Sequence, residues 1–197
     1  MKKLVPAELP KSATATFKII KEIIAKGWMD MPEGKSYGGT GAPGRFLEHL
    51  CEIKENNRDS PDLNDWEVKF HSGTAPITLF HKSPEPRGIM GTVVHLHGWP
   101  AKNQTSFRHT VWGTSDRGFY VVNEADRVVI RNSNLDSVVP YWTHNVLLSN
   151  CAAKIRRLIV IDGEYKKTQR KIRYTGATAY WGLRITAFAP SIADGTI

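Results

Sequence analysis

The chain of 197 residues contains little cysteine and no long apolar run, and both absences narrow the classes of protein to which it can belong. Cys51 and Cys151 are its two thiols and no CxxC spacing occurs, which argues against a disulfide framework and a cysteine-ligated zinc site. No stretch approaches the roughly 18 consecutive apolar residues of a membrane-spanning helix, and the first residues lack the apolar core of a secretory signal. We therefore expect no membrane association and a location in the cytoplasm.

The sequence also lacks internal repeats, low-complexity tracts and the biased composition of disordered or fibrous proteins. Hydrophobic residues make up 41% of the chain and charged residues 23%, which is ordinary for a globular protein. A chain of this length can bury a sizeable core, and it predicts one domain.

Charge of one sign is in excess, and the excess is uneven along the chain. The formal net charge is +8. Residues 1–100 hold 13 Lys and Arg against 12 Asp and Glu, whereas residues 101–197 hold 14 against 7, and 9 of those 14 are Arg. Arginine suits bidentate recognition of phosphates and guanine edges. On charge alone, a polyanion-binding surface and a surplus that keeps the protein soluble both remain open.

Hydrophobic periodicity predicts a mixture of helices and short strands. Helices are expected at residues 14–26, 44–55 and 143–156. Strands are expected at residues 66–71, 77–82, 91–97, 105–112, 118–123, 127–132 and 158–161. The first two strands are expected to form a hairpin across Ser72 and Gly73, and residues 118–132 a second hairpin. This pattern favours an α/β fold with a mixed sheet.

The strand that begins near Trp66 has a pattern suited to phosphodiester hydrolysis. Glu67 and Lys69 are two residues apart, so both side chains project from one face of the strand. Asp62 lies at the entry of the strand, directly after a proline that favours an extended or turn geometry there. Carboxylates are ligands that Mg²⁺ prefers, and a nearby ammonium can stabilise developing negative charge. An exposed Glu/Lys face with no function is the alternative interpretation.

Several segments together resemble the PD-(D/E)xK nuclease superfamily. They are Gly44–Glu48, Pro61-Asp62, Trp66–Lys69 and Ile77–Phe80. Within the superfamily they are similar to the MutH-like branch, and in it to the MvaI/BcnI-type restriction endonucleases. This resemblance implies a restriction-endonuclease-like mixed β-sheet flanked by helices, with a β-rich DNA-recognition lobe.

The resemblance also implies roles for individual residues. Asp62 and Glu67 become metal ligands together with the backbone carbonyl of Val68, Lys69 becomes the catalytic lysine, and Glu48 is the glutamate on the preceding helix. The implied cofactor is Mg²⁺, for which Mn²⁺ substitutes. Asp65 is an extra carboxylate, and the choice between Asp62 and Asp65 stays open, although Asp62 is favoured.

The function implied is that of a Mg²⁺-dependent, sequence-specific endodeoxyribonuclease, a type II restriction enzyme that acts as a monomer on double-stranded DNA. A companion DNA methyltransferase is an expected partner. We expect a catalytic lobe at roughly residues 1–100 and a DNA-recognition lobe at roughly residues 101–197. Two alternatives remain: a strand-specific nicking enzyme of repair or phage origin, and a non-catalytic DNA-binding protein whose E-x-K pattern is accidental.

Candidate DNA contacts come from histidines and cations outside the catalytic pattern. His95 and His97 are expected on one face of a strand, while Arg108 and His109 should alternate across another strand. The full set of candidates is His95, His97, Arg108, His109, Arg117, Arg127, Arg131, Lys166, Lys167, Arg170 and Lys171. A solvated surface position is the alternative for each of them.

Overall fold

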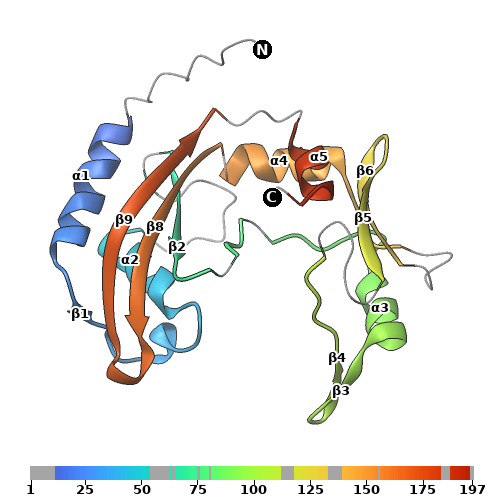
Figure 1. Ribbon diagram of the computed structural model, residues 1–197, viewed down its shortest axis with the longest axis horizontal. Coiled ribbons are helices and arrows are strands. Elements are labelled where there is room, and N and C mark those ends of the chain that lie inside the picture. Colours follow the sequence, from blue (N-terminus) through green and yellow to red (C-terminus); the bar gives the residue numbers. More distant parts are fainter. Residues whose placement is uncertain are drawn as a thin grey trace. The chain divides into compact units, whose positions relative to one another are not determined.

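The computed structural model describes residues 12–53, 63, 65–74, 76–79, 81–111, 118–132, 139–154, 156–182 and 187–195. Its elements fall into two compact units, of which the first comprises Met1–Phe80 and Asn150–Leu183 and the second His81–Ser149 and Arg184–Ile197. This division differs from the expected boundary near residue 100, because the chain returns to the first unit to complete its sheet. Each unit combines helices and strands, so the predicted α/β class is confirmed (Figure 1).

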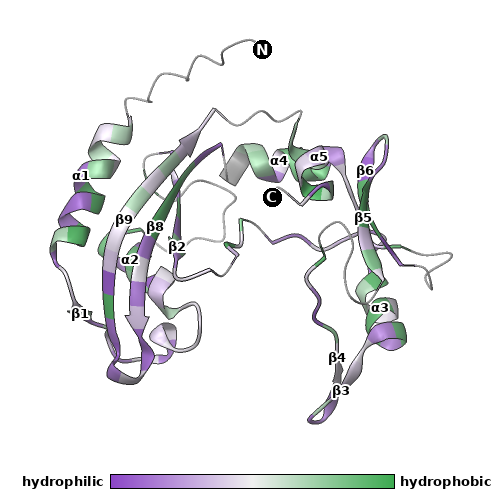
Figure 2. Ribbon diagram, viewed as in Figure 1, coloured by the Kyte–Doolittle hydropathy of each residue, from purple (hydrophilic) through white to green (hydrophobic). Residues whose placement is uncertain are grey.

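The first unit contains a four-stranded mixed sheet in the order β1-β9-β8-β2. Its strands are β1 (Met29–Asp30), β2 (Glu67–His71), β8 (Arg157–Lys166) and β9 (Lys171–Trp181). Strand β2 runs parallel to β8, whereas β8 and β9 form a long antiparallel hairpin around the short 3₁₀ turn Lys167–Gln169. Figure 2 shows that β8 is apolar over its first half and hydrophilic toward this turn.

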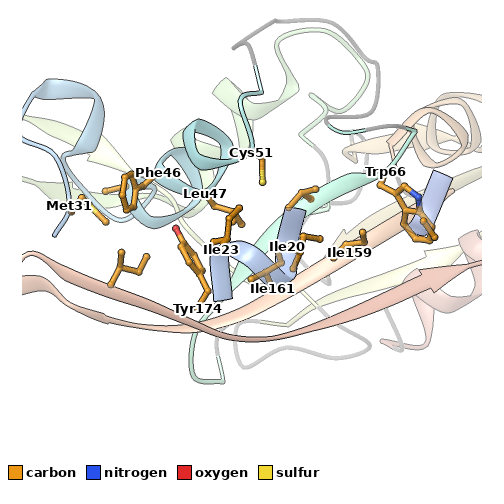
Figure 3. Packing of buried hydrophobic residues seen from close by; sticks show 14 residues of the cluster. Ile20, Ile23, Met31, Phe46, Leu47, Cys51, Trp66, Ile159, Ile161 and Tyr174 are labelled. Atoms are coloured by element: carbon orange, nitrogen blue, oxygen red, sulfur yellow. The ribbon is translucent and has the colours of Figure 1, made fainter. Parts of the chain in front are cut away.

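Helices α1 (Ser12–Ala25) and α2 (Ala42–Leu50) pack on one face of this sheet and confirm two predicted helices. The helices contribute the buried side chains of Ile20, Ile23, Phe46 and Leu47, and the sheet contributes those of Val68, Ile159, Ile161, Ile172 and Tyr174 (Figure 3). The Tyr174 hydroxyl donates a hydrogen bond of 2.9 Å to the carbonyl of Pro43 at the start of α2. Burial raises the pKa of this phenol far above its usual value.

Alternation along β2 follows from this packing. Because Val68 points into the helix-covered core, its neighbours Glu67 and Lys69 project from the opposite face of the sheet. The predicted strand at residues 66–71 is therefore confirmed together with the shared face of Glu67 and Lys69.

The second unit is built on a three-stranded antiparallel sheet in the order β5-β6-β7. Its strands are β5 (Phe119–Asn123), β6 (Arg127–Asn132) and β7 (Tyr141–Thr143), and the β5–β6 pair confirms the predicted second hairpin. Helix α5 (Phe188–Ala193) packs against β5 and β6. The unit also contains helix α3 (Ile89–His97) and the short hairpin of β3 (Trp99–Ala101) and β4 (Gln104–Ser106). Helix α4 (His144–Lys154) is divided, with residues 144–149 in the second unit and the rest in the first.

Three strand predictions are wrong in whole or in part. The segment expected as a strand at residues 91–97 is helix α3, in which Ile89 and Val93 are buried four residues apart as one helical face. The hairpin partner expected at residues 77–82 is no strand in its described part, because β2 pairs with β8 instead. The strand expected at residues 105–112 ends at Ser106 within the described residues. Strand β9 was not expected at all.

Within the described part of the chain, no helix has both the length and the apolar composition needed to cross a membrane.

Candidate active site

Glu67 and Lys69 form a close ion pair on the face of β2 that points away from helices α1 and α2. The Lys69 Nζ lies 2.5 Å from the Glu67 Oε1, and the Glu67 side chain is 2% exposed while that of Lys69 is 27% exposed. A buried carboxylate requires a compensating charge and hydrogen bonds. The Lys69 ammonium supplies that charge in this structure, and it reaches the surface of the sheet where a substrate can approach.

Glu48 lies on α2, half-buried, and its backbone carbonyl accepts a hydrogen bond from Ile53 (2.9 Å). Together with Arg45 and His49 it lines a pocket of about 190 Å³. The Arg45 guanidinium donates hydrogen bonds to the carbonyls of Ser36 and Gly38, which fixes the glycine-rich segment before α2.

The proposed metal ligands are described only in part. Asp62 lies outside the described residues, so its place relative to Glu67 stays a prediction. Among the residues that the structure describes, no group of three His, Cys, Asp or Glu side chains could hold a metal ion. Glu67 and the adjacent Val68 are the members of the predicted ligand set that the structure places.

Asp65 occupies a tight turn directly before β2. Leu63 and Trp66 exchange backbone hydrogen bonds of 2.9 and 2.8 Å across this turn, and Asp65 adopts a positive φ of 72°. Its Oδ2 lies 3.2 Å from a guanidinium nitrogen of Arg157, and its side chain is 74% exposed. Asp65 therefore has a cation as its partner at the surface, and the choice between Asp62 and Asp65 as the ligand stays a prediction.

A second polar pair lies on the same face of the sheet as Glu67 and Lys69. His71 follows Lys69 by two residues on β2, and its Nδ1 lies 2.8 Å from the Oδ1 of Asp162 on the neighbouring strand β8. Neither residue is among the candidates predicted from the sequence. The continued alternation E-x-K-x-H was a signal for His71, whereas Asp162 could be found only from the pairing of β2 with β8.

The basic residues around the β8–β9 turn are largely engaged with the segment that leads into and out of β1. The Lys166 Nζ lies 4.4 Å from the centre of the Trp28 ring, and the guanidinium of Arg170 donates to the carbonyl of Pro32. The Lys171 Nζ lies 3.9 Å from a carboxylate oxygen of Asp30. These contacts hold the turn against the segment around β1 in the same unit, and Lys167 is exposed at its tip. Their predicted role as DNA contacts stays a prediction.

Arg127 and Arg131 on β6 converge on the carboxylate of Glu124, which is not among the residues predicted from the sequence. The Arg127 Nε lies 2.7 Å from the Glu124 Oε2, and Arg131 pairs with the other oxygen of the same carboxylate. These hydrogen bonds, from Arg131 first and then from Arg127, lower the pKa of Glu124. The Arg127 guanidinium also lies 5.0 Å from the centre of the Tyr141 ring. Arg117 lies outside the described residues.

The histidine candidates of the second unit are placed differently from expectation. On helix α3, His95 and His97 are separated by about 200° around the axis, so the expected shared strand face is wrong. His95 is exposed, whereas the ring centre of His97 lies 5.0 Å from that of Phe119. The ring centre of His109 lies 5.4 Å from that of Phe119, and Arg108 is exposed in a segment without strand structure.

Comparison with known proteins identifies the family. The model of the MvaI/BcnI restriction endonuclease family matches residues 17–197. The solved structure of a restriction endonuclease MvaI–cognate DNA substrate complex aligns with a TM-score of 0.77 at 20% identity, over 95% of this chain and 82% of that chain. MvaI in the absence of DNA aligns with a TM-score of 0.48 at 22% identity, over 93% of this chain and 86% of that chain.

One curated protein also shows local similarity. The WD repeat-containing protein 35 of Homo sapiens is 26% identical over 128 residues, which are 64% of this chain and 10% of that protein. The chain thus spans about a tenth of the length of this relative. The family model extends over nearly the whole chain, and the fold is that of a solved restriction endonuclease. The chain belongs to the MvaI/BcnI restriction endonuclease family, a family of sequence-specific endonucleases.

Proposed function

We propose that the chain is a type II restriction enzyme that cleaves double-stranded DNA as a Mg²⁺-dependent monomer. The observation that carries this proposal is the Glu67–Lys69 pair on β2, an E-x-K strand with a buried carboxylate and a lysine that reaches the surface. Membership of a restriction endonuclease family supports the same reading. A companion DNA methyltransferase that protects host DNA, and a location in the cytoplasm, belong to the proposal.

The chemistry of the donor set fits a hard divalent cation. The Glu67 carboxylate is almost fully buried and offers oxygen, the donor that Mg²⁺ prefers, and its present counter-charge is the Lys69 ammonium. Glu67, the carbonyl of Val68 and Asp62 would hold the ion. A bound Mg²⁺ supplies positive charge beside the phosphate oxygens.

Lys69 has a separate role in the proposed reaction. Its ammonium lies at the surface of the sheet, so it can donate a hydrogen bond to a phosphate oxygen while keeping its contact with Glu67. Such a preorganised donor stabilises the charge that develops on the phosphate when water attacks in line with the leaving 3′ oxygen. Lys69 thereby orients the phosphate and lowers the barrier to cleavage.

A strand-specific nicking enzyme is the second candidate. A single site at the Glu67–Lys69 pair would hydrolyse one strand in each chemical event. A nicking enzyme and a restriction enzyme would use the same residues and differ in whether the second strand is cut.

Incubation of supercoiled plasmid with the purified protein tests the proposal. We expect cleavage with Mg²⁺ or Mn²⁺, none with EDTA, and DNA binding without turnover in Ca²⁺. Discrete bands support the restriction enzyme, whereas open circles without further products support the nicking enzyme. Plasmid that stays supercoiled under every condition would overturn both and leave a DNA-binding protein.

Lys21→Ala on the exposed face of α1 is a control for the loss of one positive charge. Sequencing the ends of the products would identify the recognition site.

A further inference from the structure

The polar face of β2 continues beyond the E-x-K pattern to a histidine held by a carboxylate. Glu67, Lys69 and His71 alternate along β2 and share one face, so His71 lies about 6.6 Å along the strand from Lys69. The His71 Nδ1 lies 2.8 Å from the Asp162 Oδ1, and the two side chains are 27% and 48% exposed. Both groups are thus accessible from the side of the sheet on which Lys69 reaches the surface.

A local irregularity of the β8–β9 hairpin accompanies this pair. The register of β8 against β9 shifts between Asp162 and Gly163, which is a β-bulge. A Cβ at Gly163 would lie 2.5 Å from the carbonyl oxygen of Arg173 and 2.8 Å from the Phe70 ring, so only glycine fits there. Bulges of this kind change the direction of a neighbouring side chain and often occur next to active sites. At this bulge, Asp162 lies opposite His71 in the register of β2 and β8.

The two pairs differ in what they can do with a proton. The Lys69 Nζ lies 2.5 Å from the Glu67 Oε1 and is placed to donate hydrogen bonds on this face. In His71, donation from Nδ1–H to Asp162 leaves the lone pair of Nε2 to accept a proton. A carboxylate that orients an imidazole in this way also stabilises the imidazolium that forms. Another charged pair on this face joins Glu164 of β8 to Arg173 of β9, with 2.7 Å between the Glu164 Oε1 and a guanidinium nitrogen of Arg173.

We propose that His71, oriented by Asp162, is the general base that accepts a proton from the water attacking the scissile phosphate. The inference rests on the proposed function. The water loses one proton to the His71 Nε2 while its oxygen forms the new bond to phosphorus. The bond from phosphorus to the 3′ oxygen breaks, and that oxygen takes a proton from solvent. His71 then returns its proton to solvent, so that one water is consumed for each bond hydrolysed.

Single-turnover cleavage of a duplex that the wild-type protein cuts tests the assignment. His71→Gln removes the proton acceptor and keeps a polar side chain, and it should slow cleavage at least about 10²-fold, the lower end for general base catalysis. Asp162→Asn should give an intermediate loss. The double variant should be no slower than His71→Gln alone, because Asp162 acts through His71. Glu164→Gln is the matched control, since it removes a carboxylate two residues along the same strand, and its rate should stay close to that of the wild type.

DNA affinity in Ca²⁺ and thermal unfolding are measured on the same variants to separate catalysis from binding and folding. Unchanged affinity and unfolding with a lost rate support the general base. A His71→Gln rate within about threefold of the wild type would overturn it, as would lost affinity with an intact rate, which would make His71 a phosphate contact. Additive losses in the double variant would also overturn it.

If the wild-type protein cleaves no DNA, the proposed function fails first. If it cleaves and His71→Gln is equally fast, this inference alone fails. If His71→Gln does not fold, Asp162→Asn decides the question, because its side chain is half exposed.

Discussion

At the scale of single residues, the burial of the Glu67 carboxylate makes this residue depend on a nearby positive charge. Its side chain is 2% exposed, so the negative charge must be balanced from within the site. In this structure Lys69 balances it, and in the proposed enzyme a divalent cation would share that task. The same burial explains why the sequence motif requires both residues on one strand face, since a carboxylate on the opposite face of β2 would enter the hydrophobic core.

Lys69→Ala should reduce turnover far more than DNA affinity. A donor that acts on charge developing in the transition state contributes to the rate and little to ground-state binding. We expect a loss of at least about 10²-fold in single-turnover rate, the size of one lost electrostatic donor. Binding measured in Ca²⁺ should change little. If binding is lost and the rate of the bound complex is kept, Lys69 is only a phosphate contact.

Substitution of the acidic residues should decide which carboxylate joins Glu67. Asp62→Ala and Glu67→Ala should each abolish cleavage, because they remove proposed ligands of one ion. Asp65→Ala should retain cleavage, since the Asp65 carboxylate pairs with Arg157 at the surface. Circular dichroism and thermal unfolding of each variant serve as controls for folding. An active Glu67→Ala variant would contradict the assignment of the site, and an inactive, folded Asp65→Ala variant would exchange the roles of Asp62 and Asp65.

At the scale of structural elements, the β5–β6 hairpin presents two arginines on a single carboxylate. Glu124 lies in the turn, and its two carboxylate oxygens accept hydrogen bonds from Arg127 and Arg131, which both lie on β6. This arrangement restricts the rotamers of two long side chains before any DNA is bound. A preorganised arginine loses less conformational entropy on forming a bidentate contact than a free one.

Glu124→Gln should therefore reduce sequence discrimination while leaving the chemistry of cleavage intact. The glutamine amide carries no charge, so it cannot accept strong hydrogen bonds from both guanidinium groups. If Arg127 and Arg131 read bases, discrimination at their base pairs should fall, up to about 1–3 kcal/mol for each contact. Cleavage of cognate and single-substitution duplexes measures the effect. Equal discrimination by the wild type and Glu124→Gln would show that this hairpin reads no bases.

The basic turn between β8 and β9 calls for a different measurement. Each phosphate contact that is removed should flatten the slope of log K against log salt by about 0.9. Neutralising Lys166, Lys167, Arg170 and Lys171 together should give a clearly shallower slope with specific and non-specific DNA alike. Because Lys166 and Arg170 contact Trp28 and Pro32, Lys167→Gln alone is the control that leaves these contacts in place. Unchanged slopes would show that the turn serves the structure of the first unit only.

Local sequence patterns predicted the elements whose contacts are themselves local. Helix α1 follows from a stripe of apolar residues at helical spacing. The β5–β6 hairpin follows from two runs of alternating residues on either side of a turn at Glu124. The E-x-K face of β2 followed from alternation alone. Helix α3 was predicted as a strand because its run of Val93, Val94 and alternating histidines favours extended structure. In the structure Ile89 and Val93 are buried on one helical face, and the backbone N–H groups of Ile89 and Gly98 donate to the carbonyls of Pro86 and Val94 at its ends.

Pairings between distant segments could not be predicted in the same way. Strand β9 contains Gly176 and polar residues at many positions, so its extended structure depends on β8. The parallel pairing of β2 with β8 joins segments about 90 residues apart in the sequence. Asp162 and the anchoring of the basic turn on Trp28 both depend on these pairings, which is why neither was found from the sequence.

At the scale of the whole molecule, the chain is interleaved between two units that carry different chemistry. The first unit holds the Glu67–Lys69 pair, and the second holds the arginine hairpin around Glu124. The basic turn of β8 and β9, although it lies in the second half of the sequence, belongs to the first unit. Charge in the second half of the chain is therefore distributed over both units, and the net charge of +8 favours association of the molecule as a whole with polyanions.

The proposed monomer predicts how activity depends on the mixture of active and inactive chains. A monomer with one E-x-K site cuts one strand per event, so open-circular plasmid should accumulate before linear product. When wild-type protein is mixed with Lys69→Ala at constant total concentration and excess DNA, activity should fall in proportion to the wild-type fraction. If cleavage required two active chains in one dimer, activity would follow the square of that fraction. Gel filtration provides the control, with elution expected near the chain mass of 22.1 kDa. A quadratic dependence, with linear product appearing before open circles, would contradict the monomer and assign each strand to its own subunit.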